Sequence, residues 1–396
     1  MTESATPPTG PRRPQRSLLQ VPATQRRPPE RTKASTLDSR VHNRSLVLAT
    51  LYHEGPRSRS EIARASGLTA PTISALVADL EEDGLVADIG PRQGAARLGK
   101  PASLVRIEDN SVHLVVLDLS HNDRFSGAVL NLRGEVVARR DVPLGDALGA
   151  AAHALVIRLA ADLIDAAPRR VLGIGVGSPG IIDDAGIIRL AAHLGWTDLP
   201  LAAELTDRFG IPAYVGNDVN LAALGVLHFR EARTQNLMVI SIEHGVGAGL
   251  IVGGERVEGE QFAAGEIGHV TVDEHGELCM CGRRGCLDLA IDAGHLSRRL
   301  ALAAEERRPA LRAEAGRALG TVLAPIISVL NLNEIVLTGP PELVEGEFLR
   351  AAREVVRART LGPVNVALDI RSLAGDTDLI LLGGACLVLA AELGVL

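Results

Sequence analysis

Three of the four cysteines lie within eight positions, and a histidine stands ten residues before the first of them. These residues are His269, Cys279, Cys281 and Cys286. Thiolate sulfurs and a neutral imidazole nitrogen are the ligands that tetrahedral Zn²⁺ prefers, and four of them close a structural site. Gly282 and Gly285 allow the chain to curl until the sulfurs converge. The spacing predicts a structural zinc site, with three reduced thiols in a loop as the alternative.

A second candidate site follows the apolar stretch at residues 213–217, which we expect to be a strand. Asn217 and Asp218 stand at its end. Ligands of α/β sheets bind beyond the carboxyl ends of strands, so polar side chains at this point can contact a ligand. Alternatively, Asn217 only caps the helix that follows. Capping and binding are compatible.

Helix signals precede both sites, between residues 37 and 107. A first helix ends at Gly55, and Ser58 and Glu61 form a capping box that opens a second helix. Thr69 caps a third helix with the inward stripe Ile73, Leu76, Val77 and Leu80. Two short helices joined by a glycine turn predict a helix-turn-helix, whose second helix enters the major groove of DNA. A three-helix protein-interaction module is the alternative.

The expected groove-facing side chains are hydroxyls and small groups, which can contact phosphates, base edges or thymine methyls. Residues 85–87 and 104–107 resemble the two strands of a wing, and the segment between them carries three cations. The predicted DNA contacts are Thr69, Pro71, Thr72, Ser74, Ala75, Arg97 and Lys100.

The net charge of −7 is unevenly distributed. Residues 1–40 carry eight basic and three acidic side chains, which gives +5, and residues 41–107 carry eight and seven, which gives +1. The remainder therefore carries −13, so a contact with nucleic acid is expected near the amino-terminal end. Residues 1–36 are rich in Pro and Arg and are expected to be a disordered basic tail, which either adds phosphate affinity or is inert.

The motifs Gly-Glu-x-Gly-His at 265–269 and Cys-x-Cys-Gly-x-x-Gly-Cys at 279–286 resemble the signature of the ROK family of repressors, open reading frames and sugar kinases. The resemblance extends from about residue 37 to the end, and includes a Gly-Lys-Pro wing tip at 99–101. It implies an α/β fold in which a winged helix-turn-helix (37–107) precedes a two-lobed actin-like ATPase (ribonuclease H-like) domain (108–396). It also implies that His269 and the three cysteines hold a zinc ion, which fixes a loop shaping a monosaccharide site.

The resemblance also implies sugar contacts. Glu266 matches a ligand of sugar hydroxyls, and Asn217 and Asp218 match the asparagine and the catalytic base of the family's kinases. Asp288 stands where the family has a glutamate, and His193 replaces an asparagine, so the reach of both contacts differs. The expected sugar contacts are Asn217, Asp218, Glu266, His269, Asp288 and His193. Trp196 is expected to pack in the core.

The nucleotide loops depart from the family pattern at three places. Residues 118–122 read Asp-Leu-Ser-His-Asn where the family has Asp-x-Gly-Gly-Thr, and Glu243-His244 replaces Gly-Thr. Residues 338–341, on the adenosine side, are also altered. Side chains at 120 and 121 hinder close approach of backbone to phosphate, and the carboxylate at 243 repels it. We therefore expect that ATP binding is lost, that Asp218 is a vestigial base and that the chain is not an enzyme.

Further elements are expected from the pattern in the second half of the chain. Helices are expected at 145–167, 295–318, 319–330 and 347–359, a strand at 366–370, and a last helix opening at Gly383 and containing a core thiol, Cys386. The apolar runs are too short for a membrane helix, and no export signal is seen.

The favoured function is a cytoplasmic, sugar-responsive transcriptional regulator, most simply a repressor of carbohydrate genes. Its partners are operator DNA and a monosaccharide effector, and it acts as a homodimer or homotetramer because one module makes too few DNA contacts. Two rivals remain: an active sugar kinase that carries a DNA-binding domain, and a constitutive DNA binder with a vestigial sugar pocket. The sequence does not name the sugar or the operator.

Overall fold

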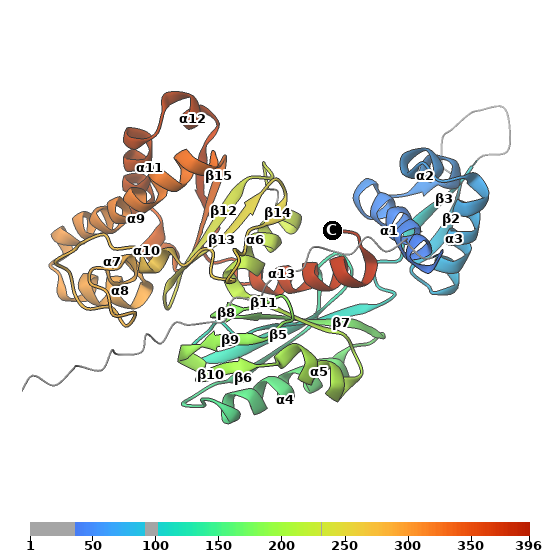
Figure 1. The fold of residues 1–396 in the computed structure, drawn as a ribbon, viewed down its shortest axis with the longest axis horizontal. Coiled ribbons are helices and arrows are strands. Elements are labelled where there is room, and N and C mark those ends of the chain that lie inside the picture. Colours follow the sequence, from blue (N-terminus) through green and yellow to red (C-terminus); the bar gives the residue numbers. More distant parts are fainter. Residues whose placement is uncertain (1–35, 92–101, 231) are drawn as a thin grey trace, which may run out of the picture. The chain divides into compact units, whose positions relative to one another are not determined.

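A winged helix and two five-stranded sheets make up the part of the chain that the computed structural model describes, residues 36–91, 102–230 and 232–396 (Figure 1). The α/β architecture predicted from the sequence is confirmed. The predicted domain boundaries at 36 and 107 stay a prediction. The expected basic tail and the wing residues Arg97 and Lys100 lie outside the described residues.

The winged helix forms from the local signals expected. Its elements are α1 (Thr36–Glu54), β1 (Arg57–Ser58), α2 (Arg59–Ser66), α3 (Ala70–Glu82), β2 (Val86–Pro91) and β3 (Ser103–Ile107). The Ser58 side chain accepts from the Glu61 amide and the Glu61 side chain accepts from the Ser58 amide, so the capping box is confirmed. Gly67 ends α2 in the left-handed conformation, and Thr69 caps α3. The predicted stripe of α3 is buried.

The first sheet has the strand order β11-β7-β4-β5-β6. Its strands are β4 (His113–Asp118), β5 (Arg124–Leu130), β6 (Val136–Pro143), β7 (Val171–Ser178) and β11 (Ala213–Asn217). Side chains alternate between its faces: Val115 and Leu117 pack in one core cluster with α4 (Ala150–Ala166) and α5 (Leu201–Phe209), and Leu114 and Val116 pack in another. A small sheet, β10-β9-β8, adjoins it, with β8 (Ile181–Ile182), β9 (Ile188–Ala191) and β10 (Trp196–Leu199).

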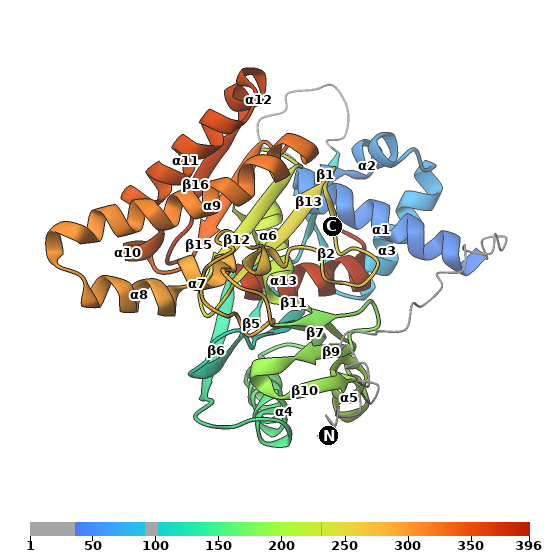
Figure 2. The ribbon, with the colours of Figure 1, turned by 60° about the vertical axis from the view of Figure 1, so that its left-hand side comes forward.

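The second sheet has the order β14-β13-β12-β15-β16. Its strands are β12 (Leu237–Ile242), β13 (Val246–Val252), β14 (Glu255–Arg256), β15 (Glu334–Thr338) and β16 (Asp369–Ser372). Between β14 and β15 the chain forms α7 (Leu287–Ile291), α8 (Ala293–Leu302) and α9 (Arg308–Leu330). Between β15 and β16 it forms α10 (Pro341–Val344), α11 (Glu347–Arg359) and α12 (Gly362–Ala367). Helices α9 and α11 lie side by side (Figure 2).

Two helices, α6 (Asp218–Phe229) and α13 (Leu379–Val388), lie between the two sheets (Figure 1). Their backbones approach so closely that a Cβ at Gly383 would stand 1.9 Å from the carbonyl oxygen of Leu221. A Cβ at Gly225 would likewise stand 2.3 Å from the carbonyl oxygen of Leu379. One glycine on each helix therefore permits this crossing, which places the start of α6 between the sheets.

Four expected boundaries were wrong. Helix α4 begins at Ala150, five residues later than expected, and α8 ends at Leu302, so the expected division at 318/319 does not exist. Helix α9 begins at Arg308, because Pro309 suits the first turn of a helix, and it continues without a break to Leu330. Residues 362–367 form α12 where a strand was expected to start at 366. Helix α13 begins at Leu379, because its glycines serve packing rather than helix initiation.

The winged helix shares a core with the first sheet. Leu48 and Leu51 of α1 lie in the same cluster as Leu114 of β4 and Leu393 near the carboxyl terminus. The Tyr52 hydroxyl donates to the carbonyl oxygen of Leu132 at 2.9 Å. The winged helix thus packs against the first sheet through apolar side chains and through polar contacts at the end of α1.

One described helical stretch, Glu305–Leu330, has the length and composition of a membrane span, with a mean hydropathy of 1.3 over its apolar window. Its buried residues, among them Leu319, Leu323 and Ile327, pack in the core of the second sheet. It also contains Pro325 and four arginines. A core helix of a globular domain passes the same test, so this stretch is not evidence for a membrane.

Candidate functional site

The four residues expected to bind zinc come together. The ligand atoms of His269, Cys279, Cys281 and Cys286 all lie within 4.8 Å of one another. The Sγ atoms of Cys281 and Cys286 are 3.5 Å apart, and His269 Nδ1 is 3.7 Å from Cys279 Sγ. Metal–sulfur bonds of about 2.3 Å in a tetrahedron separate sulfurs by about 3.8 Å, so the donor set fits a tetrahedral metal. We call these four residues the metal cluster.

Local backbone conformation brings the metal cluster together. Gly282 and Gly285 have φ of 85° and 60°. A Cβ at Gly285 would stand 1.6 Å from the carbonyl oxygen of Asp273, so no other residue fits there. Cys279 and Cys286 are buried, and Cys281 is exposed. The cluster therefore has one sulfur accessible to solvent.

Asp288 joins the metal cluster to the second sheet. Its Oδ1 accepts from the Val246 amide at 2.8 Å, and its Oδ2 lies 3.4 Å from His269 Nδ1. A Cβ at Gly268 would lie 2.1 Å from Asp288 Oδ1. The carboxylate thus contacts the turn between β12 and β13, a contact that sequence reasoning missed. Direct sugar binding by Asp288 stays a prediction.

Buried carboxylates gather near the carboxyl ends of the strands. Asp118 ends β4 and is 1% exposed, and Asp218 opens α6 directly after β11. Burial, with Asp118 and Glu266 nearby, raises the pKa of Asp218 to about 7. Burial also raises the pKa of Glu266 and of Glu243. The buried carboxylates Asp118 and Asp218 therefore lie near the half-buried Glu243 and the more exposed Glu266.

The raised pKa of Asp218 predicts a pH dependence of stability. An aspartate in an unfolded chain has a pKa of about 3.9, so between about pH 4 and pH 7 the folded state keeps a proton that the unfolded state releases. The free energy of unfolding therefore falls as pH rises, by about 3 kcal/mol between pH 5 and pH 8 for this group. In urea unfolding, Asp218→Asn is expected to remove that fall.

The matched control is Asp184→Asn, at an exposed aspartate in the loop between β8 and β9. It is expected to leave the difference between pH 5 and pH 8 as in the wild type. An Asp218→Asn protein with an unchanged pH dependence would contradict the assignment of a neutral, buried Asp218.

Asn217 and His193 border the same region. The Asn217 side chain caps α6 by accepting from the Asn220 amide at 3.0 Å and donates to the Gly180 carbonyl at 3.1 Å, so the capping alternative is confirmed. His193 lies in a 3-10 turn, η1 (Ala192–Leu194), where desolvation and the neighbouring His244 lower its pKa. The indole of Trp196 is buried and donates to the Gly149 carbonyl at 2.9 Å, so its expected packing role is confirmed.

The turn after β4 folds onto its own carboxylate. The Ser120 amide and hydroxyl donate to Asp118 Oδ1 at 2.9 and 2.7 Å, and His121 Nε2 lies 3.4 Å from Asp118 Oδ2. Glu243 lies near enough to His121 and Asp118 for both to affect its pKa. The groups of this turn that could face a phosphate are therefore engaged within the chain. The contact between His121 and Asp118 is a second feature that the sequence did not indicate.

The exposed surface of α3 carries Thr69, Pro71, Ser74 and Ala75. The Thr72 side chain is half-buried and shares a hydrogen bond of 2.8 Å with the Thr69 hydroxyl. Several cations of the winged helix are paired within it: Arg40 with Asp79, Arg44 with Asp83, and Arg59 with Glu81 and Asp88. The exposed face at the start of α3 therefore carries small side chains that are accessible to solvent.

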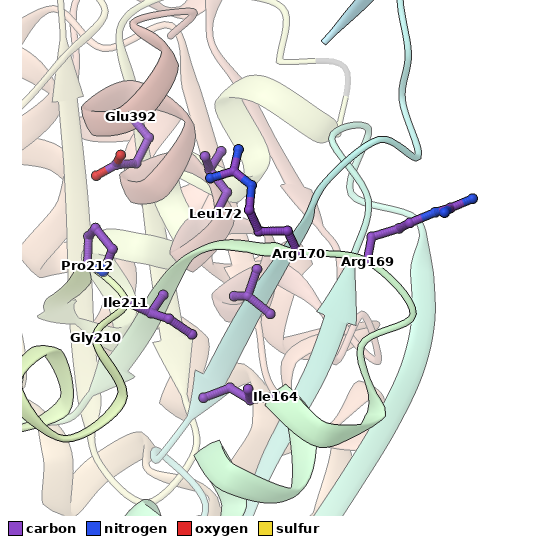
Figure 3. A pocket seen from close by; sticks show the side chains of 9 residues that line it. Ile164, Arg169, Arg170, Leu172, Gly210, Ile211, Pro212 and Glu392 are labelled. Atoms are coloured by element: carbon purple, nitrogen blue, oxygen red, sulfur yellow. The ribbon is translucent and has the colours of Figure 1, made fainter. Parts of the chain in front are cut away.

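A hollow of about 490 Å³ lies elsewhere, at the amino ends of β7 and β11 (Figure 3). Ile164, Arg170, Ile211 and Glu392 are among its lining residues, and Arg169 points away from the others. None of the expected sugar contacts lines it. The hollow lies at the amino ends of the strands, whereas Asp218 follows the carboxyl end of β11, so the hollow is separate from the candidate site.

Comparison with known proteins matches residues 122–390 to the ROK family and residues 42–96 to the MarR family. A putative xylose repressor of Caldicellulosiruptor sp. (strain Rt8B.4) is 29% identical over 357 residues, covering 80% of this chain and 88% of the relative. The crystal structure of a ROK family transcriptional regulator, a homologue of the E. coli MLC protein, superposes with a TM-score of 0.80 at 21% identity, over 90% of this chain and 98% of that one. A ROK hexokinase from Thermus thermophilus superposes with a TM-score of 0.58 at 26% identity, over 69% of this chain and 97% of that one.

Proposed function

The chain belongs to the ROK family, and from this premise we propose that it is a sugar-responsive, DNA-binding transcriptional regulator. The observation that carries the proposal is the junction of a winged helix, with an open α3 face, to a ROK domain. The regulator structure matches both parts, over 90% of this chain, whereas the hexokinase structure matches 69%. One relative is named a putative xylose repressor, which makes repression of carbohydrate genes the favoured direction and xylose the first sugar to test.

The winged helix at 37–107 is the DNA-binding part of this proposal. Helix α3 enters the major groove and presents Thr69, Pro71, Ser74 and Ala75, while the half-buried Thr72 orients the Thr69 hydroxyl. Since several described cations are paired internally, Arg97 and Lys100 of the wing are proposed to supply phosphate contacts. A dimer or tetramer reads two half-sites.

The ROK domain at 108–396 binds the effector. We assign Asn217, Asp218, Glu266, His269, Asp288 and His193 to the sugar site, which requires carboxylate and imidazole groups that hydrogen-bond hydroxyls. A zinc ion is proposed in the metal cluster. Nδ1 of His269 lies on the side of Cys279 Sγ and would bind the metal, which would leave Nε2 available to a sugar hydroxyl. The role of the metal is structural: it holds the segment between Glu266 and Asp288, which spans two proposed contacts.

The regulator is proposed to lack kinase activity, and to act in the cytoplasm. The rival is an active kinase, which Asp218 at the base position favours. The engaged turn at Ser120 and His121 and the half-buried Glu243 oppose it, because each disfavours a bound phosphate.

A thermal unfolding measurement separates the regulator from the kinase. ATP with Mg²⁺ at 1 mM is expected to leave the melting temperature unchanged, because the first phosphate loop lacks its glycines and Glu243 repels phosphate at the second. A cognate sugar at a hundredfold excess over its dissociation constant stabilises the folded state by about 2.7 kcal/mol and raises the melting temperature. A rise with ATP would support the kinase, and the absence of a shift with any monosaccharide would support a constitutive DNA binder.

A further inference from the structure

The metal cluster is asymmetric in its exposure. Cys279 and Cys286 are 4% and 0% exposed, whereas Cys281 is open to solvent. The next residue, Gly282, has no atom within 4 Å of an added Cβ, so the backbone beside Cys281 is unobstructed. Arg283 hydrogen-bonds the sulfur of Cys281. Cys281 is therefore the cysteine of the cluster that can meet a small solute, since the other two cysteines are buried and His269 is half-buried.

The exposed sulfur has a buried partner within reach. Cys281 Sγ and Cys286 Sγ are 3.5 Å apart, and a disulfide requires about 2.05 Å, so the two sulfurs need to approach by only about 1.5 Å. The other described cysteine outside the cluster, Cys386, is 2% exposed and hydrogen-bonds the Leu224 carbonyl in the core. Cys279 Sγ also lies within 4.8 Å of both sulfurs, but the 3.5 Å separation and the exposure of Cys281 favour the pair Cys281 and Cys286 for oxidation.

We propose that Cys281 is an oxidation site through which a peroxide releases the metal and uncouples the effector site. The inference rests on the proposed zinc ion. The Cys281 thiolate attacks one oxygen of hydrogen peroxide; an S–O bond forms, the O–O bond breaks and hydroxide leaves, which gives a sulfenic acid. The Cys286 thiolate then attacks Cys281 Sγ; an S–S bond forms, the S–O bond breaks and a second hydroxide leaves. Two thiolates lose two electrons and the peroxide gains them.

Only His269 and Cys279 then remain for the metal, which is too few for a closed tetrahedral site. The same oxidation releases the segment that contains Glu266 and Asp288. The hydrogen bond from the Val246 amide to Asp288 is then lost as well. The affinity for the operator would then no longer change when the sugar is added. The disulfide is reversible by a dithiol, so the device can reset.

The test uses zinc-loaded full-length protein. Hydrogen peroxide is added, released zinc is followed with a chromogenic chelator, and disulfides are mapped by peptide mass spectrometry. About one zinc per chain is expected to appear together with a Cys281–Cys286 linked peptide, and dithiothreitol with zinc should restore the starting state. Cys281→His keeps a nitrogen ligand and should release zinc at least tenfold more slowly. Cys386→Ser is the control and should behave as the wild type.

Zinc retained under peroxide, or released with a disulfide to Cys279 as the main product, would overturn this inference and leave the proposed regulator intact. Equal release rates for Cys281→His and the wild type would do the same. Protein that is purified folded but free of zinc would instead overturn the metal centre, and this inference with it. Metal analysis before the peroxide is added distinguishes the two failures.

Discussion

Replacing Cys279 with serine is expected to lower the zinc content from about one ion per chain to less than about a tenth. Cys279 is buried and lies 3.7 Å from the imidazole of His269, so its loss removes one of four ligands and leaves the others unable to close the site. Since metal binding at a structural site contributes directly to folding, the melting temperature should fall by several degrees. Elemental analysis and thermal unfolding measure the two effects.

Cys386→Ser is the matched control, because Cys386 is also a buried cysteine but belongs to α13 rather than to the metal cluster. Its zinc content should stay at about one per chain. A Cys279→Ser protein that keeps its zinc, or wild-type protein that folds without any metal, would contradict the assignment of the four ligands.

A glutamate at position 75 is expected to weaken operator binding by about 100-fold or more. Ala75 lies on the exposed face of α3, where the proposed docking places it against the floor of the major groove. A carboxylate there meets the negative potential of DNA, and a lost base contact costs about 1–3 kcal/mol in each half-site. Fluorescence anisotropy of a labelled duplex gives the dissociation constant.

Ala301→Glu adds the same charge at an exposed position of α8, far along the chain from the winged helix, and should leave operator binding within about twofold. If Ala75→Glu bound the operator as tightly as Ala301→Glu, α3 would not be the recognition helix. The thermal stability of both variants should match the wild type, because both side chains are exposed.

Features set by short stretches of sequence were predictable. The capping box at Ser58, the stop at Gly67 and the convergence of three cysteines around Gly285 each depend on residues only a few positions apart. Both ends of α11, expected at 347–359, were predicted to the residue. Local chemistry therefore sufficed for the winged helix and for the metal cluster.

Features set by contacts between distant segments were not predictable. Gly383 was expected to open a helix, but it lies within α13. It is a glycine because the backbone of α6 passes directly beside it. The hydrogen bond from Val246 to Asp288 joins residues 42 positions apart, and periodicity carries no trace of it. Tertiary packing decided these two. The pairing of His121 with Asp118 joins residues only three positions apart and was missed for another reason, since it depends on how the turn after β4 folds back.

The most direct test of the central claim is the affinity of the full-length protein for DNA from the region upstream of its own gene, with and without monosaccharides. A sugar-responsive regulator should bind this DNA saturably at 150 mM salt, and its affinity should change by about 5- to 150-fold with one sugar. Glu266→Ala should keep the DNA affinity and lose the response to that sugar. Sequence-independent binding, or an affinity that no monosaccharide alters, would contradict a sugar-responsive regulator.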